Sequence, residues 1–165
     1  MIKFEKISYE QFKKDMNKFF PTMEEGHIKT CYNNIKLPQR GSSGSAGYDI
    51  YSPVCFTCSP NGEPVLIPTG IRAVMPEDLY LQIVPRSSIG FKSGVSLANT
   101  VAIIDSDYAK SLNEGHIMLK FVPGFKELVI NVEDRIAQGI FIKYYKTDDD
   151  DIISVRLGGI GSTGV

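Results

Sequence analysis

The chain has 165 residues, and 18 Lys and Arg stand against 19 Asp and Glu, so its formal net charge is -1. This length fits one domain, or one domain with an appendage. The even charge balance excludes a general nucleic-acid-binding protein, and a hydrophobic content of 42% excludes a disordered chain. Every apolar run is shorter than the roughly 18 residues of a membrane span, so we expect neither nucleic acid nor a membrane as a partner.

The sequence predicts a cytoplasmic protein with reduced thiols. Charged residues interrupt residues 1–6, which therefore do not read as a secretory signal. The cysteines number three, an odd count that fits free thiols in a reducing compartment. Cys55 and Cys58 form a lone C-x-x-C pair, but zinc would need two further ligands. We therefore favour ordinary strand thiols over a zinc site.

The first predicted element is a short helix within an N-terminal extension, residues 1–26. Ser8 and Gln11 have the spacing of a capping box, and Ile7 can pack as a hydrophobic staple on the apolar stripe that follows. The stripe recurs at helical spacing and consists of Phe12, Met16, Phe19 and Phe20. Pro21 ends the helix. This aromatic stripe fits packing on the flank of the same domain or a contact with another subunit or protein, and the sequence favours neither.

From residue 27 the pattern changes to short β-branched and aromatic runs separated by Gly, Pro, Asn and Asp turns. The runs are roughly 8–12 residues apart, and no strong helical pattern intervenes. This spacing predicts an all-β sandwich or barrel over residues 27–147. An acidic loop and a flexible glycine-rich tail then form a C-terminal arm, residues 148–165.

Two segments have the composition of phosphate-binding loops, residues 85–90 and residues 156–164. Glycines in the second segment let backbone amides approach a ligand closely. Arginine and hydroxyl side chains supply further donors in both: Arg86, Ser87 and Ser88 in the first, and Arg156, Ser162 and Thr163 in the second. Each segment alone is weak evidence, because loops rich in Gly and Ser are usually turns or mobile ends.

The candidate general base is Asp105, which ends the apolar run of residues 101–104. A carboxylate that ends an apolar strand is expected to be partly desolvated, which suits a general base. Asp105 and Asp107 share a face if the strand continues through both. The alternative is a turn-forming Asp-Ser-Asp. His27 and His116 are the only histidines, and nothing in the sequence supports a Ser–His–Asp triad.

Taken in order, five segments resemble the motifs of the trimeric dUTP pyrophosphatase (dUTPase) family. They are Gly44–Ile50, Pro85–Ser88, Asn99–Tyr108, Arg135–Gln138 and the glycine-rich tail. The match spans residues 35–164, and five motifs in one order make it specific. The resemblance implies a distorted jelly-roll or β-barrel and a homotrimer with shared active sites. It also implies Mg²⁺-dependent hydrolysis of dUTP to dUMP and pyrophosphate.

The resemblance also implies which residues contact the reacting nucleoside. Asp105 matches the catalytic position, where a carboxylate activates water for in-line attack on the α-phosphate. Uracil would lie in the hairpin from Asn99 to Tyr108, with Asn99 and strand amides reading its polar edge and Ile104 beside it. Tyr108 would lie against the deoxyribose and leave no space for a 2′-hydroxyl. Ile160 would cover the base.

Further roles carried over from the family concern the triphosphate and the metal. The phosphate groups would be bound by Arg86, Ser87, Ser88, Gln138, Arg156, Ser162 and Thr163. Mg²⁺ would be held mainly by triphosphate oxygens and waters, with Asp49 and Gln138 reaching it through water. Arg135 would support the site. In an unbroken strand Arg135 and Gln138 point to opposite faces, so both reach one ligand only if the strand bends.

Three departures from the family pattern bear on the tail and the hairpin. Ile160 stands where the family usually has a Phe that stacks on uracil, a contact worth about 1–3 kcal/mol. Ala102 occupies a usual Gly position, and residues 111–115 lengthen the loop after Tyr108. Two alternatives stay open: a dCTP deaminase of the same fold, and a nucleotide-sensing binding protein with weak turnover, which Ile160 suggests.

Overall fold

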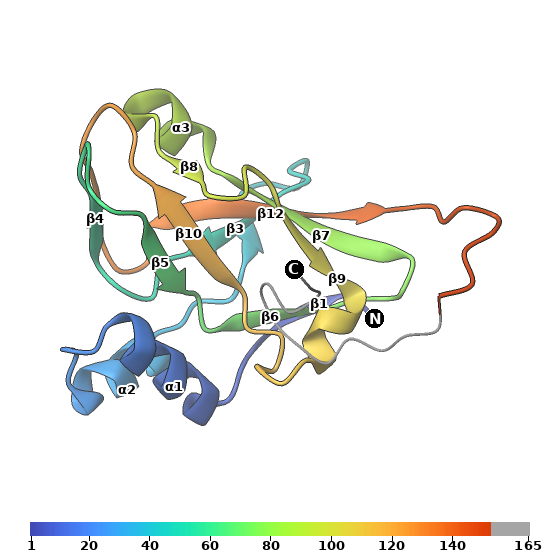
Figure 1. Ribbon diagram of the computed structural model, residues 1–165, viewed down its shortest axis with the longest axis horizontal. Coiled ribbons are helices and arrows are strands. Elements are labelled where there is room, and N and C mark those ends of the chain that lie inside the picture. The colour runs from blue at the N-terminus through green and yellow to red at the C-terminus, as the bar shows by residue number, and fades with distance from the viewer. Residues whose placement is uncertain (153–165) are drawn as a thin grey trace.

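The computed structural model describes residues 1–152, and its architecture is mainly β, as predicted (Figure 1). The elements are, in chain order, β1 (Lys3–Lys6), α1 (Tyr9–Phe19), α2 (Glu25–Asn33), β2 (Gln39–Arg40), β3 (Tyr48–Tyr51), β4 (Phe56–Cys58), β5 (Val65–Pro68), β6 (Ile71–Val74), β7 (Leu79–Pro85), α3 (Ser87–Ser93), β8 (Ser96–Leu97), β9 (Ala102–Asp105), the 3-10 helix η1 (Ser106–Lys110), β10 (Met118–Val122), β11 (Leu128–Ile130) and β12 (Arg135–Lys143). The described helices are too short to cross a membrane.

Within residues 1–152 the strands pair antiparallel in four sheets around one core. The largest sheet has the order β2-β3-β12-β7-β9, and the smaller ones are β5-β10-β8, β1-β6 and β11-β4. The long strand β12 crosses the centre of the molecule (Figure 1) and pairs with both β3 and β7. Inward side chains alternate along the strands, so Leu81 and Ile83 of β7 and Leu119 and Phe121 of β10 are at most 1% exposed.

Helix content is higher than the sequence predicted, because α2 and α3 were not expected. In α2 only Ile28 and Cys31 are buried, and this narrow apolar side packs on α1, so its helical period was too weak to stand out. The segment predicted as the loop Arg86-Ser87-Ser88 instead starts α3, with Arg86 as N-cap and Gly94 ending the helix at a φ of 71°. The division of the chain at residue 26 stays a prediction.

The N-terminal helix α1 packs on the core of its own chain. Ser8 caps it, since the Gln11 N–H donates to Ser8 Oγ over 3.2 Å, and Ile7 and Phe12 are both buried as the staple requires. Only half of the capping box forms, because the Gln11 side chain donates to Asp15 and the Ser8 N–H donates to the Glu114 carboxylate. The first two residues of the apolar stripe, Phe12 and Met16, therefore pack against the core of the same domain.

Acid should weaken the attachment of α1. Burial raises the pKa of Asp15, but hydrogen bonds from His116 and Gln11 outweigh it and bring the pKa below its ordinary value of 3.8. The carboxylate therefore stabilises the fold fully above that ordinary pKa, and this contribution is lost as the pH falls through the lowered folded value.

We accordingly expect the unfolding free energy of the wild type to fall more steeply below about pH 4 than that of Asp15→Asn, measured by urea titration. Asp148→Asn, in the exposed acidic loop, should follow the wild type. Equal slopes for the wild type and Asp15→Asn would contradict this role of Asp15.

Candidate active site

A pocket of about 380 Å³ opens beside β9, β10 and β5, and it contains three of the predicted nucleoside-binding residues, Asn99, Ile104 and Tyr108. A volume of this size suits a small organic ligand. The sequence reasoning missed Leu66, Met118 and Lys120, which also line the pocket. The alternation on β10 places Met118 and Lys120 on the face opposite to its core residues, but local pattern does not say which hairpin that face meets.

Tyr108 is both a buried ring and a wall of this pocket. It lies in η1, directly after β9, and is 4% exposed. Its hydroxyl donates to the carbonyl oxygen of His116 over 2.9 Å and accepts from Asn113 Nδ2 over 2.9 Å. Tyr108 is therefore part of the packed interior and is also placed to contact a ligand in the pocket.

Asp105 ends β9 and lies one residue after Ile104, so the two side chains point to opposite faces of the strand. It lines a neighbouring pocket of about 570 Å³ together with Asp107 and Arg72, and not the pocket of Asn99 and Tyr108. The 3-10 helix starts at Ser106, so the strand does not continue through Asp107. The Asp105 side chain is exposed in the single chain, where partial desolvation was expected. Removing its solvent requires a second surface.

A second cluster joins Asp49 with Arg86 and Arg135. Asp49 Oδ1 lies 3.3 Å from Arg86 Nε, and Asp49 Oδ2 lies 3.4 Å from Arg135 Nη1. Asp49 is 8% exposed, so this nearly buried carboxylate holds both guanidinium groups in place. The seryl residues of the same motif, Ser87 and Ser88, follow Arg86 in the first turn of α3 and are exposed.

Gln138 lies on β12 directly opposite Asp49 on β3, so their side chains share one face of the sheet. The bend that Arg135 needs is present, because the register shifts by a β-bulge between Arg135 and Ala137. One extra residue reverses the alternation and brings Arg135 to the face of Gln138. Gly47 leaves space for the Gln138 side chain, since a Cβ added at Gly47 would lie 2.8 Å from Gln138 Oε1.

Asp105 and the cluster of Asp49, Arg86 and Arg135 lie apart in one chain. Asp105 pairs with Tyr80 near the start of β7, whereas Pro85, beside Arg86, pairs with Ala137 at the far end. Tyr80 and Pro85 are five residues apart on β7. A strand rises about 3.3 Å per residue, so the separation along β7 is about 17 Å. A single chain therefore does not bring the catalytic candidate Asp105 to the cluster of Asp49 and Arg86.

Metal-binding side chains do not gather among residues 1–152, where no three His, Cys, Asp or Glu side chains form a candidate metal site. All three cysteines are free, and burial raises the pKa of the Cys31 and Cys58 thiols. Raised thiol pKa values agree with inert strand and helix thiols. The remaining predicted site residues, Arg156, Ile160, Ser162 and Thr163, lie outside the described residues.

Several known proteins are similar to this chain in sequence. A family model described as dUTPase matches residues 33–164. A deoxyuridine 5'-triphosphate nucleotidohydrolase from Lactococcus lactis is 39% identical over 144 residues, which are 83% of this chain and 95% of the relative. The enzyme of the same name from Monkeypox virus is 37% identical over 138 residues, covering 81% of this chain and 86% of the relative.

Solved structures have the same fold. The crystal structure of dUTPase from Streptococcus mutans superposes with a TM-score of 0.66 at 30% identity, covering 88% of this chain and 98% of that chain. A mutant of the Staphylococcus bacteriophage 80alpha dUTPase with dUpNHpp has a TM-score of 0.64 at 15% identity, covering 93% of this chain and 97% of that chain. At that identity the likeness shows the fold alone.

Proposed function

The chain belongs to the dUTPase family, and from that premise we propose that it hydrolyses dUTP to dUMP and pyrophosphate in a homotrimer with shared active sites. The observation that carries the proposal is the division of the site. Asp105 lies at one end of β7, where it pairs with Tyr80, and the cluster of Asp49 and Arg86 lies at the other, beside Pro85. Two half-sites with complementary chemistry make one complete site when two chains meet.

The first half-site binds the nucleoside. Asn99 and strand amides read the polar edge of uracil, and Ile104 packs beside the base. A tight hairpin excludes the thymine methyl group by overlap and places a donor against the N4 amine of cytosine. The Tyr108 ring lies against the deoxyribose and leaves no room for a 2′-hydroxyl. The pocket that these three residues share supports this arrangement.

The reaction is attack by water on the α-phosphorus. Asp105 accepts a proton from the water as its oxygen bonds to phosphorus. The bond between the α-phosphorus and the oxygen that bridges to the β-phosphate then breaks, and pyrophosphate leaves. The exposed Asp105 of the single chain becomes desolvated when the second chain covers it.

The second half-site binds the triphosphate. Arg86, Ser87 and Ser88 hold the α- and β-phosphates, and Gln138 adds an amide. Asp49 positions Arg86, which it contacts at 3.3 Å. Arg135 supports the arrangement through its own contact with Asp49.

The C-terminal arm completes the site. Arg156, Ser162 and Thr163 of a third chain close over the β- and γ-phosphates, and Ile160 covers the base. We assign the core on which the arm closes to the distorted jelly-roll form. The free thiols support a cytoplasmic location.

The oxygen atoms of Asp49 and Gln138 suit the binding of Mg²⁺ through coordinated water molecules. The Asp49 carboxylate and the Gln138 amide oxygen are the oxygen ligands that Mg²⁺ prefers. Asp49 is already paired with Arg86 and Arg135, so it suits a hydrogen bond to a coordinated water better than direct ligation. When bound to the triphosphate, the ion neutralises charge that develops on the phosphates.

Pyrophosphate release from dUTP, dCTP, TTP and UTP with Mg²⁺ tests the proposal. We expect release from dUTP alone. Equal turnover of TTP or UTP would contradict the selectivity of the pocket. Ammonia from dCTP would favour the deaminase, and binding of dUTP without pyrophosphate release in a single turnover would favour the nucleotide sensor.

Gly47→Ala should raise the KM for dUTP several-fold. The new Cβ would lie 2.8 Å from Gln138 Oε1, so the amide must move away from the triphosphate. Gly44→Ala is the matched control from the same loop, because an added Cβ there meets nothing within 4 Å. Steady-state kinetics of both variants provide the measurement, and an equal KM for both would remove Gln138 from the binding site.

A further inference from the structure

The residues that hold Tyr108 form one segment, residues 111–116, which we call the brace. The Tyr108 hydroxyl accepts from Asn113 Nδ2 and donates to the His116 carbonyl oxygen, both over 2.9 Å. At the other end of the residue, the Tyr108 carbonyl oxygen accepts from the Ser111 N–H over 3.0 Å and from the Ser111 hydroxyl over 2.6 Å. The brace therefore fixes both the backbone and the ring tip of a pocket residue.

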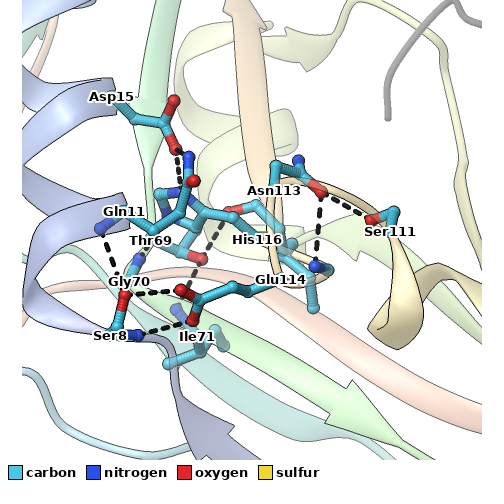
Figure 2. A network of polar contacts seen from close by, with 12 residues as sticks. Ser8, Gln11, Asp15, Thr69, Gly70, Ile71, Ser111, Asn113, Glu114 and His116 are labelled. Atoms are coloured by element: carbon cyan, nitrogen blue, oxygen red, sulfur yellow. Dashed lines mark hydrogen bonds and ion pairs between the residues drawn. The ribbon is translucent and has the colours of Figure 1, made fainter. Parts of the chain in front are cut away.

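The brace is itself fastened to the N-terminal helix (Figure 2). The Glu114 carboxylate accepts from the Ser8 N–H over 2.8 Å and also from the Ser8 hydroxyl. His116 Nδ1 lies 2.6 Å from Asp15 Oδ2, and the Gly70 N–H donates to His116 Nε2 over 2.9 Å. Since Nε2 accepts a hydrogen bond, Nδ1 carries the hydrogen that is donated to Asp15.

The geometry of the brace shows that it is held tightly. His116 is 0% exposed and Asp15 is 7% exposed, so their hydrogen bond is shielded from water. Glu114 and Gly115 both have positive φ, at 58° and 72°. An added Cβ at Gly115 would lie 2.6 Å from the Ala109 Cα, so the brace packs directly on η1, the helix that carries Tyr108. A non-glycine residue in the left-handed region persists only where its surroundings hold it.

A continuous series of contacts thus runs from α1 to the pocket. Its first link joins Ser8 to Glu114, a buried parallel link joins Asp15 to His116, and the last link joins Asn113 to the Tyr108 hydroxyl. We propose that α1, through the brace, positions the Tyr108 ring and so sets the discrimination between dUTP and UTP. Asn113 and Glu114 are then positioning residues. This inference rests on the proposed function of the pocket.

The physical reason lies in how the ring excludes a 2′-hydroxyl. Exclusion by overlap works only while the ring cannot move away, and a hydroxyl group adds one oxygen atom to the sugar. Losing the Asn113 hydrogen bond loosens the ring tip of Tyr108. The kcat/KM for UTP therefore rises relative to the kcat/KM for dUTP. One hydrogen bond of ordinary strength corresponds to a change of about two- to tenfold in the ratio of the two kcat/KM values.

The test measures kcat/KM for dUTP and for UTP in purified full-length variants. Asn113→Ala should lower the dUTP/UTP ratio about two- to tenfold, whereas Asn17→Ala, on the exposed side of α1, should leave it unchanged. Tyr108→Phe removes the hydroxyl and keeps the ring. If the brace acts through that hydroxyl, the double variant of Asn113 and Tyr108 lowers the ratio no further than Tyr108→Phe alone, which already removes the contacts with both Asn113 and His116.

Glu114→Ala tests the link to α1 without touching the pocket. Glu114 does not line the pocket, and alanine keeps the positive φ of this position as strained as before. We expect the ratio to fall, whereas Lys13→Ala, which breaks the ion pair of α1 with Glu25, should leave it unchanged. Both contacts fasten α1, but only Glu114 is connected to Tyr108.

A purely structural brace would give a different result. Asn113→Ala and Glu114→Ala would then lower the melting temperature while the dUTP/UTP ratio stays that of the wild type, and this outcome overturns the inference alone. A wild type that does not prefer dUTP over UTP overturns both the inference and the proposed function. A lowered ratio in both variants, with unchanged controls, supports the role of the brace.

Discussion

Asp105→Asn should reduce kcat for dUTP about 10²–10⁴-fold, the range that general-base catalysis contributes. The amide has nearly the shape of the carboxylate but does not accept a proton from the attacking water. The KM for dUTP should change little, because Asp105 does not line the pocket with Asn99 and Tyr108. Pyrophosphate release under saturating dUTP and Mg²⁺ provides the measurement.

The control for this change is Asp78→Asn. Asp78 is an exposed carboxylate near the start of β7, and it forms an ion pair with the Lys143 ammonium, 3.6 Å away. Its replacement should leave kcat unchanged, because exposed ion pairs contribute little. An Asp105→Asn variant with wild-type turnover would show that another group activates the water.

Patterns within a few residues of one another were enough to predict the helix cap of α1 and the buried faces of single strands. Ser8 caps α1 because its side chain reaches an N–H three residues ahead, and the alternation in β7 and β10 follows from burial of one face. The resemblance to the dUTPase family brought Asp49 and Gln138 into one site, and the register of β3 and β12 places them directly opposite each other.

Contacts between distant parts of the chain were beyond such signals. The partner of the Ser8 N–H is Glu114, 106 residues away, and not the nearby Gln11. Likewise, the bulge next to Arg135 arises from the pairing of β12 with β3, which no single strand encodes. The helix α2 was missed for a related reason, since its narrow apolar side is recognisable only when α1 lies against it.

The second large effect concerns the division of the site between chains. Asp105→Asn removes the proposed base, and Arg86→Gln removes the guanidinium that Asp49 positions. Each variant alone should be nearly inactive. In a mixed trimer, one chain can supply the intact Asp105 while its neighbour supplies the intact Arg86. Random assembly from equal amounts completes about one site in four.

Mixing the two inactive variants under conditions of subunit exchange therefore tests the central claim most directly. The account predicts that dUTP hydrolysis returns to about one quarter of the wild-type rate, together with a trimer by light scattering. The same variants mixed without exchange should stay inactive. A mixed trimer with no recovered activity would contradict the account, because it would mean that Asp105 and Arg86 serve one site within a single chain or that they do not form a common site.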